Sequence, residues 1–259
     1  MTDVLVEQQD KILSITLNRV EKHNAFDQVL LADLQAALDN SAADPSIRVL
    51  VLRANGKHFS AGADLAWMQR MANFSEAENR ADAMILAKLM YTLHHYPKPT
   101  IAMVQGAAFG GGAGLIAACD IAIAAQSARF CFSETKLGLI PAVISPYVIK
   151  AIGARAANWL FISAETFDVS RALALQLIQH AVTDETLVTF TQDYAEQLAR
   201  LAPEAMAACK RLVRDVAYQA MTPELIASTA DQIAKKRVSQ EGQHGLRAFL
   251  NKAQPNWDY

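Results

Sequence analysis

The stretch AFGGGAGLIAACDIAIA, residues 108–124, places three consecutive glycines at the start of a long apolar run. It follows TIAMVQG, a β-rich segment at residues 100–106, and contains AGLIAAC, which is typical of a short helix. Glycine lets the backbone turn sharply and approach a ligand without an intervening Cβ. The first amides of a helix have no intrahelical acceptor and lie at its positive end. The stretch therefore predicts a strand, a glycine turn and a helix whose first N–H groups could hold a negatively charged oxygen.

The surrounding sequence narrows the ligand that such a turn would hold. The stretch has neither a Walker-type glycine-rich loop ending in lysine nor a GxGxxG pattern, and no lysine or arginine lies between residues 101 and 127. A phosphate group therefore fits poorly. A single developing negative charge, such as an enolate or a tetrahedral oxyanion, suits a few amide donors better. The alternative is that the glycines only allow close helix packing, and this stretch alone leaves both interpretations open.

A second segment favours the oxyanion interpretation. GKHFSAGADL, residues 56–65, places Gly62 and Ala63 after a strand-like run and directly before Asp64. Asp64 is a suitable N-cap for a helix starting at LAWMQRM. Small residues at this turn would again expose backbone amides.

Composition excludes several classes of function. The chain has 259 residues, 52% of them apolar, and 24 lysines and arginines against 26 acidic residues, so its net charge is −2. It lacks the cationic field that holds a nucleic acid. No apolar run reaches the roughly 18 residues of a membrane span, and no leader-like segment opens the chain, so we expect a cytoplasmic protein. Cys119, Cys131 and Cys209 are odd in number and widely spaced, which predicts buried thiols without a disulfide or a metal site.

The pattern of segments predicts an α/β fold. Strands alternate with helices in the first part, which favours largely parallel sheets that follow an initial hairpin. The expected strands are residues 4–9, 11–17, 48–54, 100–106, 120–125 and 128–133; the expected helices are 27–40, 64–71, 75–95 and 111–118. From residue 145 onward only helices are expected, with a boundary near residues 190–200. No flexible linker separates the two parts, so the C-terminal helices should dock closely.

Together, HFSAGADL, GAAFGGGAGLIAACDIAIA and ARFCFSETKLGLIPAVISPYV resemble the enoyl-CoA hydratase/isomerase (crotonase) family. The likeness runs from LNRVEKHNAF, residues 17–26, through the C-terminal helices. It implies a crotonase-like spiral of strand-strand-helix repeats with a CoA thioester site over residues 1–194. A C-terminal helical oligomerisation region over residues 195–259 would form a homotrimer or a dimer of trimers. The substrates implied are acyl-CoA thioesters, with no cofactor beyond the CoA of the substrate and no metal.

The resemblance assigns the catalytic groups by motif position. The oxyanion hole falls on the Ala63 and Gly111 amides, which would hold the thioester oxygen as it becomes an enolate. Hydratases of the family commonly carry two glutamates. Glu134 matches one, whereas Gly114 stands where the other belongs. Proton transfer therefore rests on Glu134, either for syn hydration or for moving a proton between the α- and γ-carbons in an isomerisation.

A second departure concerns the substrate. Many hydratases of the family have a glycine-rich segment after the second glutamate, where this chain has PAVISPYV. This segment resembles 3-methylglutaconyl-CoA and isohexenylglutaconyl-CoA hydratases, which implies a branched acyl group that carries a carboxylate. Ser145 as N-cap, Pro146 and Gly153 also predict a short helix here. A non-catalytic acyl-CoA-binding or RNA-binding relative is the alternative from another class.

Other residues are candidates for contacts with the acyl group or with CoA. They are Lys22, Asn24, Ala61, Gly62, Asp64, Leu65, Trp67, Met68, Phe109, Gly110, Gly114 and Tyr147. Several have structural alternatives: Trp67 and Met68 could be core, and Lys22 and Asn24 could belong to an ordinary loop. Asp120 is expected to anchor the strand that follows the glycine helix. His94 and His95 are expected at a helix end without metal-ligand spacing.

Overall fold

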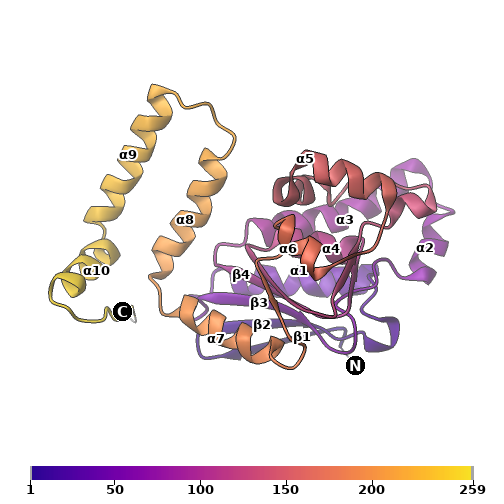
Figure 1. Cartoon of the computed structure of the whole chain (residues 1–259), viewed down its shortest axis with the longest axis horizontal. Coiled ribbons are helices and arrows are strands. Elements are labelled where there is room, and N and C mark those ends of the chain that lie inside the picture. The colour runs from indigo at the N-terminus through magenta and orange to yellow at the C-terminus, as the bar shows by residue number, and fades with distance from the viewer. Residues whose placement is uncertain (1, 258–259) are drawn as a thin grey trace.

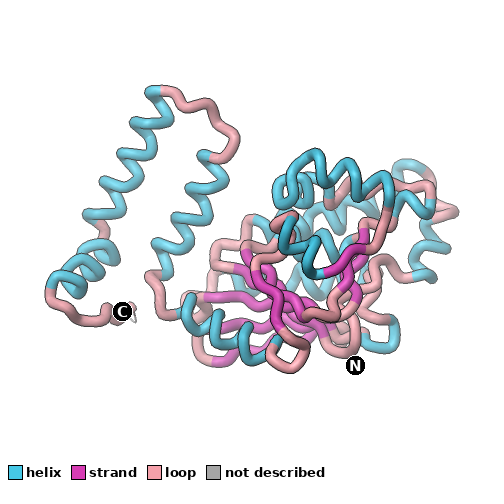
Figure 2. The backbone as a smooth tube through the Cα atoms, viewed as in Figure 1, coloured by secondary structure: helices cyan, strands magenta, loops and turns pink. Residues whose placement is uncertain are grey.

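Six strands form the main sheet in the computed structural model, which describes residues 2–257 (Figures 1 and 2). Their order is β1 (Val4–Gln9), β2 (Ile12–Leu17), β3 (Val49–Ala54), β4 (Thr100–Val104), β6 (Ile121–Ala125) and β9 (His180–Val182). The first two strands pair antiparallel as a hairpin, and every later pairing is parallel. The predicted hairpin and the largely parallel sheet are therefore confirmed.

The inner strands β3, β4 and β6 are buried on both faces of the sheet, as near-continuous apolar strands predict. Along β3, Leu50 and Leu52 point into the larger core, whereas Val49 and Val51 point into a smaller core on the opposite face. Six helices cover the larger core: α1 (Gln28–Ala42), α2 (Leu65–Met71), α3 (Glu76–His94), α4 (Gly111–Ala118), α5 (Ser145–Ser163) and α6 (Val169–Ala174). The other face is covered by α7 (Leu187–Ala199), which lies below the sheet in Figure 1.

A second, smaller sheet contains the strand that leads into the glycine turn. Its order is β5 (Ala107–Phe109), β7 (Arg129–Cys131) and β8 (Phe167–Asp168). The expectation of helices alone after residue 145 is wrong, because β8 and β9 occur there. Strands of two or three residues are too short to show a period of two, so their sequence carries no strand signal.

The helix that contains PAVISPYV differs in detail from its prediction. It runs as α5 from Ser145 to Ser163, broken at Gly153 by non-helical dihedrals of φ 77° and ψ 157°. The predicted end at Gly153 therefore corresponds to a kink between two helical halves. Ser145 is not the N-cap. That position belongs to Ile144, and the Ser145 hydroxyl donates to the Ala142 carbonyl at 2.8 Å.

The last three helices form an arm that stands away from the body in Figure 1: α8 (Pro203–Val216), α9 (Pro223–Val238) and α10 (Gln240–Leu250). Of their residues only Glu241 is buried. The expectation that the C-terminal helices dock closely is therefore wrong for this arm and correct for α7. The division expected at 194/195 falls inside α7, so the arm begins after that helix.

Three remaining expectations concern membranes, metals and thiols. Within residues 2–257, no helix is both long and apolar enough to cross a membrane. The same residues contain no group of three His, Cys, Asp or Glu side chains that could hold a metal ion. All three cysteines are free, and Cys131 is buried. The prediction of buried thiols is wrong for Cys209, which is exposed on the arm, and Cys119 is partly exposed.

Candidate active site

The two predicted amide-bearing turns lie side by side. Ser60 bridges to Ala108 in parallel: the Ser60 amide donates to the Ala107 carbonyl at 3.0 Å, and the Phe109 amide donates back to the Ser60 carbonyl at 3.0 Å. A Cβ on Gly62 would lie 3.4 Å from the Phe109 carbonyl oxygen. The turn before α2 and the turn before α4 are therefore direct neighbours, joined by backbone hydrogen bonds.

Gly111 begins α4, and Gly110 turns the chain into it. Gly110 has a φ of +52°, a conformation that glycine adopts readily, and its amide donates to the Cys131 carbonyl at 2.9 Å. The Gly111 amide follows directly, at the positive end of the helix. The Phe26 ring packs against Gly111 on the side where a side chain would project, because a Cβ on Gly111 would lie 2.8 Å from the Phe26 Cε2.

The Ala63 amide is fixed by the residues on either side of it. The Phe26 amide donates to the Gly62 carbonyl at 2.7 Å, and the Asp64 amide donates to the Phe26 carbonyl at 2.8 Å. Among the described residues, neither the Ala63 N–H nor the Gly111 N–H donates to a protein acceptor. Ala63 is exposed and Gly111 is partly exposed. Both N–H groups are thus available to an external oxygen.

Glu134 lies beside this pair of amides. It begins a short 3-10 helix, η2 (Glu134–Leu137), and its Oε1 would lie 3.3 Å from a Cβ on Gly110. Its Oε2 is buried without a hydrogen-bond partner in the described structure. Burial raises the pKa of the Glu134 carboxyl above its ordinary value. Glu134 is not paired with Lys136, the cation two residues further on, because the Lys136 ammonium points to the Cys131 Sγ at 3.8 Å.

Gly114 has no room for a side chain. A Cβ there would lie 2.3 Å from Cγ2 of Ile144 and 3.1 Å from Cε of Met90. Ile144 belongs to the PAVIS segment, so the two departures from the common family pattern meet in space. The region into which a side chain at position 114 would grow is filled by Ile144.

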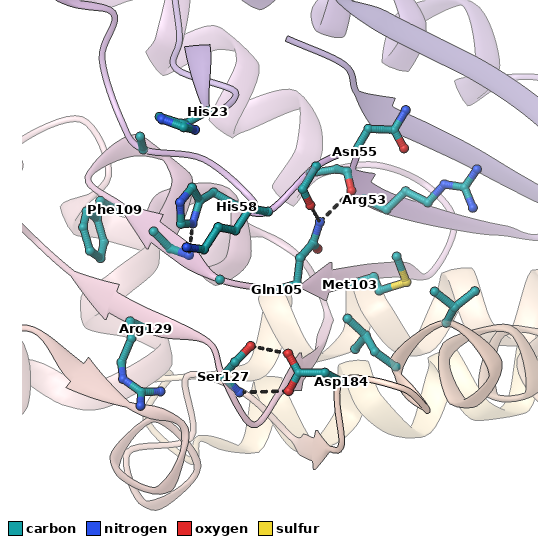
Figure 3. Close-up of a pocket in the computed structure, with 18 of the residues that line it drawn as sticks. His23, Arg53, Asn55, His58, Met103, Gln105, Phe109, Ser127, Arg129 and Asp184 are labelled. Atoms are coloured by element: carbon teal, nitrogen blue, oxygen red, sulfur yellow. Dashed lines mark hydrogen bonds between the residues drawn. The ribbon is translucent and has the colours of Figure 1, made fainter. Parts of the chain in front are cut away.

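Ala61 and Phe109 line a hollow of about 1030 Å³ on the edge of this region (Figure 3). Its lining is rich in basic groups, namely His23, Arg53, Lys57, His58 and Arg129, with Asp184 as the acidic member. Asp184 accepts hydrogen bonds from the Ser127 amide and hydroxyl. Burial and the neighbouring His23 lower the pKa of His58.

Of the two loop candidates, Lys22 is exposed and Asn24 is fully buried. Lys22 ends a 3-10 turn, η1 (Val20–Lys22). The Asn24 Oδ1 accepts from the Arg19 amide at 2.8 Å, and its Nδ2 donates to two carbonyls of the 55–58 loop. The Asn24 side chain therefore organises the backbone, and Lys22 is the member of the pair that reaches solvent.

The four candidates at the start of α2 also divide into buried residues and residues that reach solvent. Asp64 is buried and caps the helix, accepting from the Ala66 and Trp67 amides at 2.9 and 3.1 Å. The Trp67 indole is buried and donates to Asp82 Oδ1 at 3.1 Å. Leu65 is 77% exposed and Met68 is partly exposed. Leu65 and Met68 are thus the candidates of this helix that a ligand could touch.

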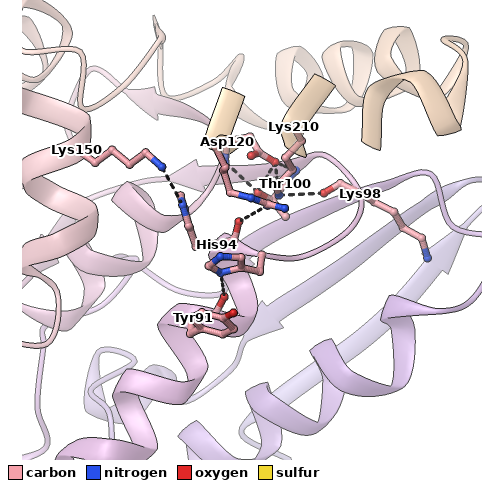
Figure 4. Close-up of polar contacts among 9 residues, drawn as sticks. Tyr91, His94, Lys98, Thr100, Asp120, Lys150 and Lys210 are labelled. Atoms are coloured by element: carbon pink, nitrogen blue, oxygen red, sulfur yellow. Dashed lines mark hydrogen bonds and ion pairs between the residues drawn. The ribbon is translucent and has the colours of Figure 1, made fainter. Parts of the chain in front are cut away.

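Tyr147 lies in a different place from Glu134. Its ring packs against His94 at 5.3 Å, in a cleft between α3, α4, α5 and α8. Here Asp120 accepts from the Thr100 amide and hydroxyl and from Lys210 at 2.7 Å (Figure 4), which confirms its predicted anchoring role. Burial and the Lys150 ammonium lower the pKa of His94 to about 4. The described residues that line this cleft include none of Ala63, Gly111 and Glu134.

Sequence reasoning missed three residues that shape the site: Arg19, Phe26 and Ile144. Arg19 and Phe26 belong to LNRVEKHNAF, a segment used in the sequence comparison only for Lys22 and Asn24. No local pattern marks Arg19, because the acids that it pairs with in the structure, Asp3, Asp27 and Asp64, lie 8 to 45 residues away in the sequence. Ile144 gave no signal, since its contact with Gly114 depends on how α5 packs on α4.

Comparisons with known proteins show the family to which the chain belongs. The family model described as enoyl-CoA hydratase/isomerase matches residues 7–259. A crystal structure of a Legionella pneumophila protein, described as an enoyl-CoA hydratase/isomerase (crotonase), superposes with a TM-score of 0.96 at 61% identity and covers 100% of both chains.

Curated relatives include hydratases and an isomerase. The 2,3-dehydroadipyl-CoA hydratase of Escherichia coli is 31% identical over 99% of both chains. The trans-2-decenoyl-[acyl-carrier-protein] isomerase of Streptococcus mutans is 26% identical over 98% of this chain and 97% of its own. The chain belongs to the enoyl-CoA hydratase/isomerase family, has the crotonase fold, and is an enzyme of the enoyl-CoA hydratase type.

Proposed function

We propose that this enzyme adds water to a 2-enoyl-CoA, with Glu134 as its single acid and base. The observation that carries the proposal is the buried, unpartnered Oε2 of Glu134 beside Gly110. A carboxyl whose pKa is raised by burial can both accept and return a proton near neutral pH. The free amides of Ala63 and Gly111 supply the donors that an enolate oxygen needs.

The reaction balances with these groups alone. The Glu134 carboxylate takes a proton from water as the water oxygen bonds to the β-carbon of the substrate. The carbon–carbon double bond becomes the enolate, whose oxygen accepts from the Ala63 and Gly111 amides. The Glu134 carboxyl then returns a proton to the α-carbon and regenerates the thioester. One carboxyl on one face of the substrate gives syn addition, and no cofactor beyond the CoA of the substrate is required.

We further propose that the acyl group is branched and carries a carboxylate. Two observations support this substrate class: the PAVISPYV segment, and the name of the E. coli relative, which describes a dicarboxylic acyl group. A CoA thioester substrate also fits a cytoplasmic enzyme, which we propose here. The basic lining of the hollow beside Ala61 suits the phosphates of CoA.

Isomerisation is the second candidate, because one specific observation favours it. Moving a double bond from the 3- to the 2-position needs one base that carries a proton between the γ- and α-carbons. The space beside Gly114 is filled by Ile144, so position 114 offers no second acid. The isomerase of S. mutans shows that this activity occurs among the relatives.

A turnover screen separates these reactions. The purified enzyme is incubated with 3-methylglutaconyl-CoA, 2,3-dehydroadipyl-CoA, crotonyl-CoA and a 3-enoyl-CoA in ¹⁸O-labelled water. Hydration of the carboxylated thioesters, with one labelled oxygen in the product and higher kcat/KM than for crotonyl-CoA, supports the proposal. Preference for crotonyl-CoA overturns the substrate class. Double-bond migration without labelled oxygen overturns hydration in favour of isomerisation.

A further inference from the structure

Arg19 lies at the centre of a polar cluster behind the oxyanion turn. It lies two residues after the end of β2, and its side chain is 14% exposed. Its Nη2 lies 2.9 Å from Asp27 Oδ2 and 3.3 Å from Asp64 Oδ2. Its Nη1 donates to the Ala25 carbonyl at 3.0 Å. The guanidinium therefore holds both residues that flank Phe26.

Phe26 in turn holds both residues that flank Ala63. Its amide donates to the Gly62 carbonyl, and its own carbonyl accepts from the Asp64 amide. A trans peptide is planar, so the Gly62 carbonyl and the Ala63 N–H point in opposite directions. Fixing the Gly62 carbonyl at 2.7 Å from the Phe26 amide thus fixes the direction of the Ala63 N–H.

Asp64 contacts both the first amides of α2 and Arg19. One carboxylate oxygen, Oδ1, accepts from two amides of α2, and the other, Oδ2, faces Arg19. Burial alone would raise the pKa of Asp64, but the Trp67 amide and the Arg19 guanidinium hold it below its ordinary value. Asp64 therefore stays ionised and ties the start of α2 to Arg19. The chain on both sides of Ala63 is held by the same guanidinium.

We propose that Arg19 is a positioning residue for the reaction: through Phe26 and Asp64 it aims the Ala63 N–H at the thioester oxygen. This inference rests on the proposed role of the Ala63 amide. Arg19 itself touches no substrate. A donor that is misdirected by a fraction of an ångström to about 1 Å loses much of its effect on a developing charge, and such displacements can cost about a hundredfold in rate.

Two variants of Arg19 test the assignment. Arg19→Met removes all the guanidinium contacts, and we expect kcat to fall about tenfold to a hundredfold while KM changes little, since the CoA contacts remain. Arg19→Lys keeps the charge but cannot reach two carboxylates and a carbonyl with a fixed fork, so it should recover only part of kcat. Arg171→Met is the matched control. It removes another ion-paired arginine, which lies on α6 and pairs with Glu165.

Asp64→Asn tests the same clamp from the other side. The asparagine oxygen can still cap α2, whereas its NH₂ group would face the Arg19 guanidinium as a second donor. We expect a fall in kcat in the same direction as for Arg19→Met. The double variant should lose less than the product of the two single losses, because both act through one contact. If Arg19→Met does not give a folded protein by circular dichroism, Arg19→Lys and Asp64→Asn decide the question.

A spectroscopic probe separates positioning from a general structural effect. The absorption of 4-(dimethylamino)cinnamoyl-CoA moves to longer wavelength when its thioester carbonyl is polarised by hydrogen-bond donors. The bound probe should shift less in Arg19→Met than in the wild type, and equally in Arg171→Met and the wild type. An unchanged kcat and an unchanged shift in folded Arg19→Met would overturn the inference. A wild-type enzyme that binds the probe without any shift would instead overturn the proposed oxyanion role of Ala63 and Gly111.

Discussion

Glu134 has one carboxylate oxygen that no described protein group satisfies, and this defines the sharpest test of the chemistry. Glu134→Gln keeps the size and much of the hydrogen-bonding capacity of the side chain but cannot gain and lose a proton. We expect turnover to fall at least about a hundredfold with little change in acyl-CoA binding. Single-turnover kinetics and a binding titration measure the two effects.

Glu165→Gln is the matched control for that change. Glu165 is also a partly exposed glutamate, but it pairs with Arg171 away from the glycine turn. Its amide variant should keep wild-type turnover. A Glu134→Gln enzyme that binds normally and turns over within a few fold of the wild type would rule out the single-carboxyl mechanism.

The raised pKa of Glu134 also predicts a pH dependence of rate. The first step needs the carboxylate, so kcat/KM should fall as the pH is lowered through the raised pKa of Glu134. The midpoint should lie above 4.5, the ordinary value for glutamate. A rate profile that stays flat down to pH 4.5 would contradict this assignment.

The raised pKa of Glu134 also makes the stability of the folded protein depend on pH. The folded state holds the Glu134 proton more tightly than the unfolded chain, so its contribution to folding is fully present below pH 4.5 and is lost as the pH rises through the raised pKa. Glu134→Gln has no charge to bury. Its Tm should exceed that of the wild type at pH 8, and the difference should vanish near pH 4. Scanning calorimetry at both pH values measures it, and equal melting temperatures at pH 8 would argue against the shift.

Gly111 allows the loss of a donor to be separated from a steric clash. Gly111→Pro removes the N–H at a helix position that otherwise accepts proline. Gly111→Ala keeps the N–H, but its Cβ would lie 2.8 Å from the Phe26 ring. Loss of one oxyanion donor is worth about 3 kcal/mol, so the proline variant should be about a hundredfold slower than the alanine variant. Similar turnover in the two folded proteins would show that this amide does not act on the substrate.

At the residue scale, the two turns before helices could be predicted from local signals, namely glycines or small residues directly before a helix start. The choice of Glu134 as the acid and base came from the family resemblance, and its role remains a prediction. The roles of Asn24 and Trp67 could not be predicted, since the acceptors of their side-chain N–H groups lie more than a dozen residues away: Asn24 donates to the 55–58 loop and Trp67 to Asp82.

At the scale of elements, the close approach of α4 and α5 makes a testable pair. Gly114→Ala alone should destabilise the protein, because the new Cβ would lie 2.3 Å from Ile144 Cγ2. Overpacking of this kind costs about 1–3 kcal/mol. Ile144→Ala should relieve part of that cost, so the double variant should be more stable than the sum of the two single effects. Urea denaturation of the four proteins measures the coupling, and simple additivity would mean that the two positions do not compete for space.

Helices with a local start signal were predicted well, whereas the short strands β8 and β9 were not. Helix α4 was expected at residues 111–118 and runs over those residues, and α3 was expected at 75–95 and runs from Glu76 to His94. The capping residues Asp64 and Ser75 mark the starts of α2 and α3. Strands β8 and β9, with two and three residues, exist because neighbouring strands offer backbone partners. No local pattern reports such partners.

At the scale of the whole molecule, the C-terminal arm exposes apolar side chains that no other described part of the same chain covers. Its helices carry large apolar side chains in the open, including Val213 at 62%, Phe249 at 79% and Leu250 at 76% exposure. Exposed apolar surface of this kind marks contacts between proteins. We therefore expect a homotrimer or a dimer of trimers, and sedimentation velocity at micromolar concentration should show no stable monomer.

A charge on the apolar face of the arm should weaken that assembly. Phe249→Glu is expected to shift the sedimenting species toward smaller sizes, whereas Val29→Glu makes the same kind of change at a 60%-exposed position on the body. The second variant should sediment like the wild type. Circular dichroism spectra of both variants should show the helix content of the wild type. A Phe249→Glu protein of unchanged size would place the contact elsewhere.

The contact between Gly114 and Ile144 also constrains how sequences of this type can change over generations. A lineage could gain an acid at position 114 by a single codon change, but the intermediate would carry a side chain where Ile144 already stands. The reverse order, with position 144 becoming smaller first, opens the space at the cost of a cavity. The order of the two substitutions therefore matters, because each of them alone is expected to give a less stable intermediate.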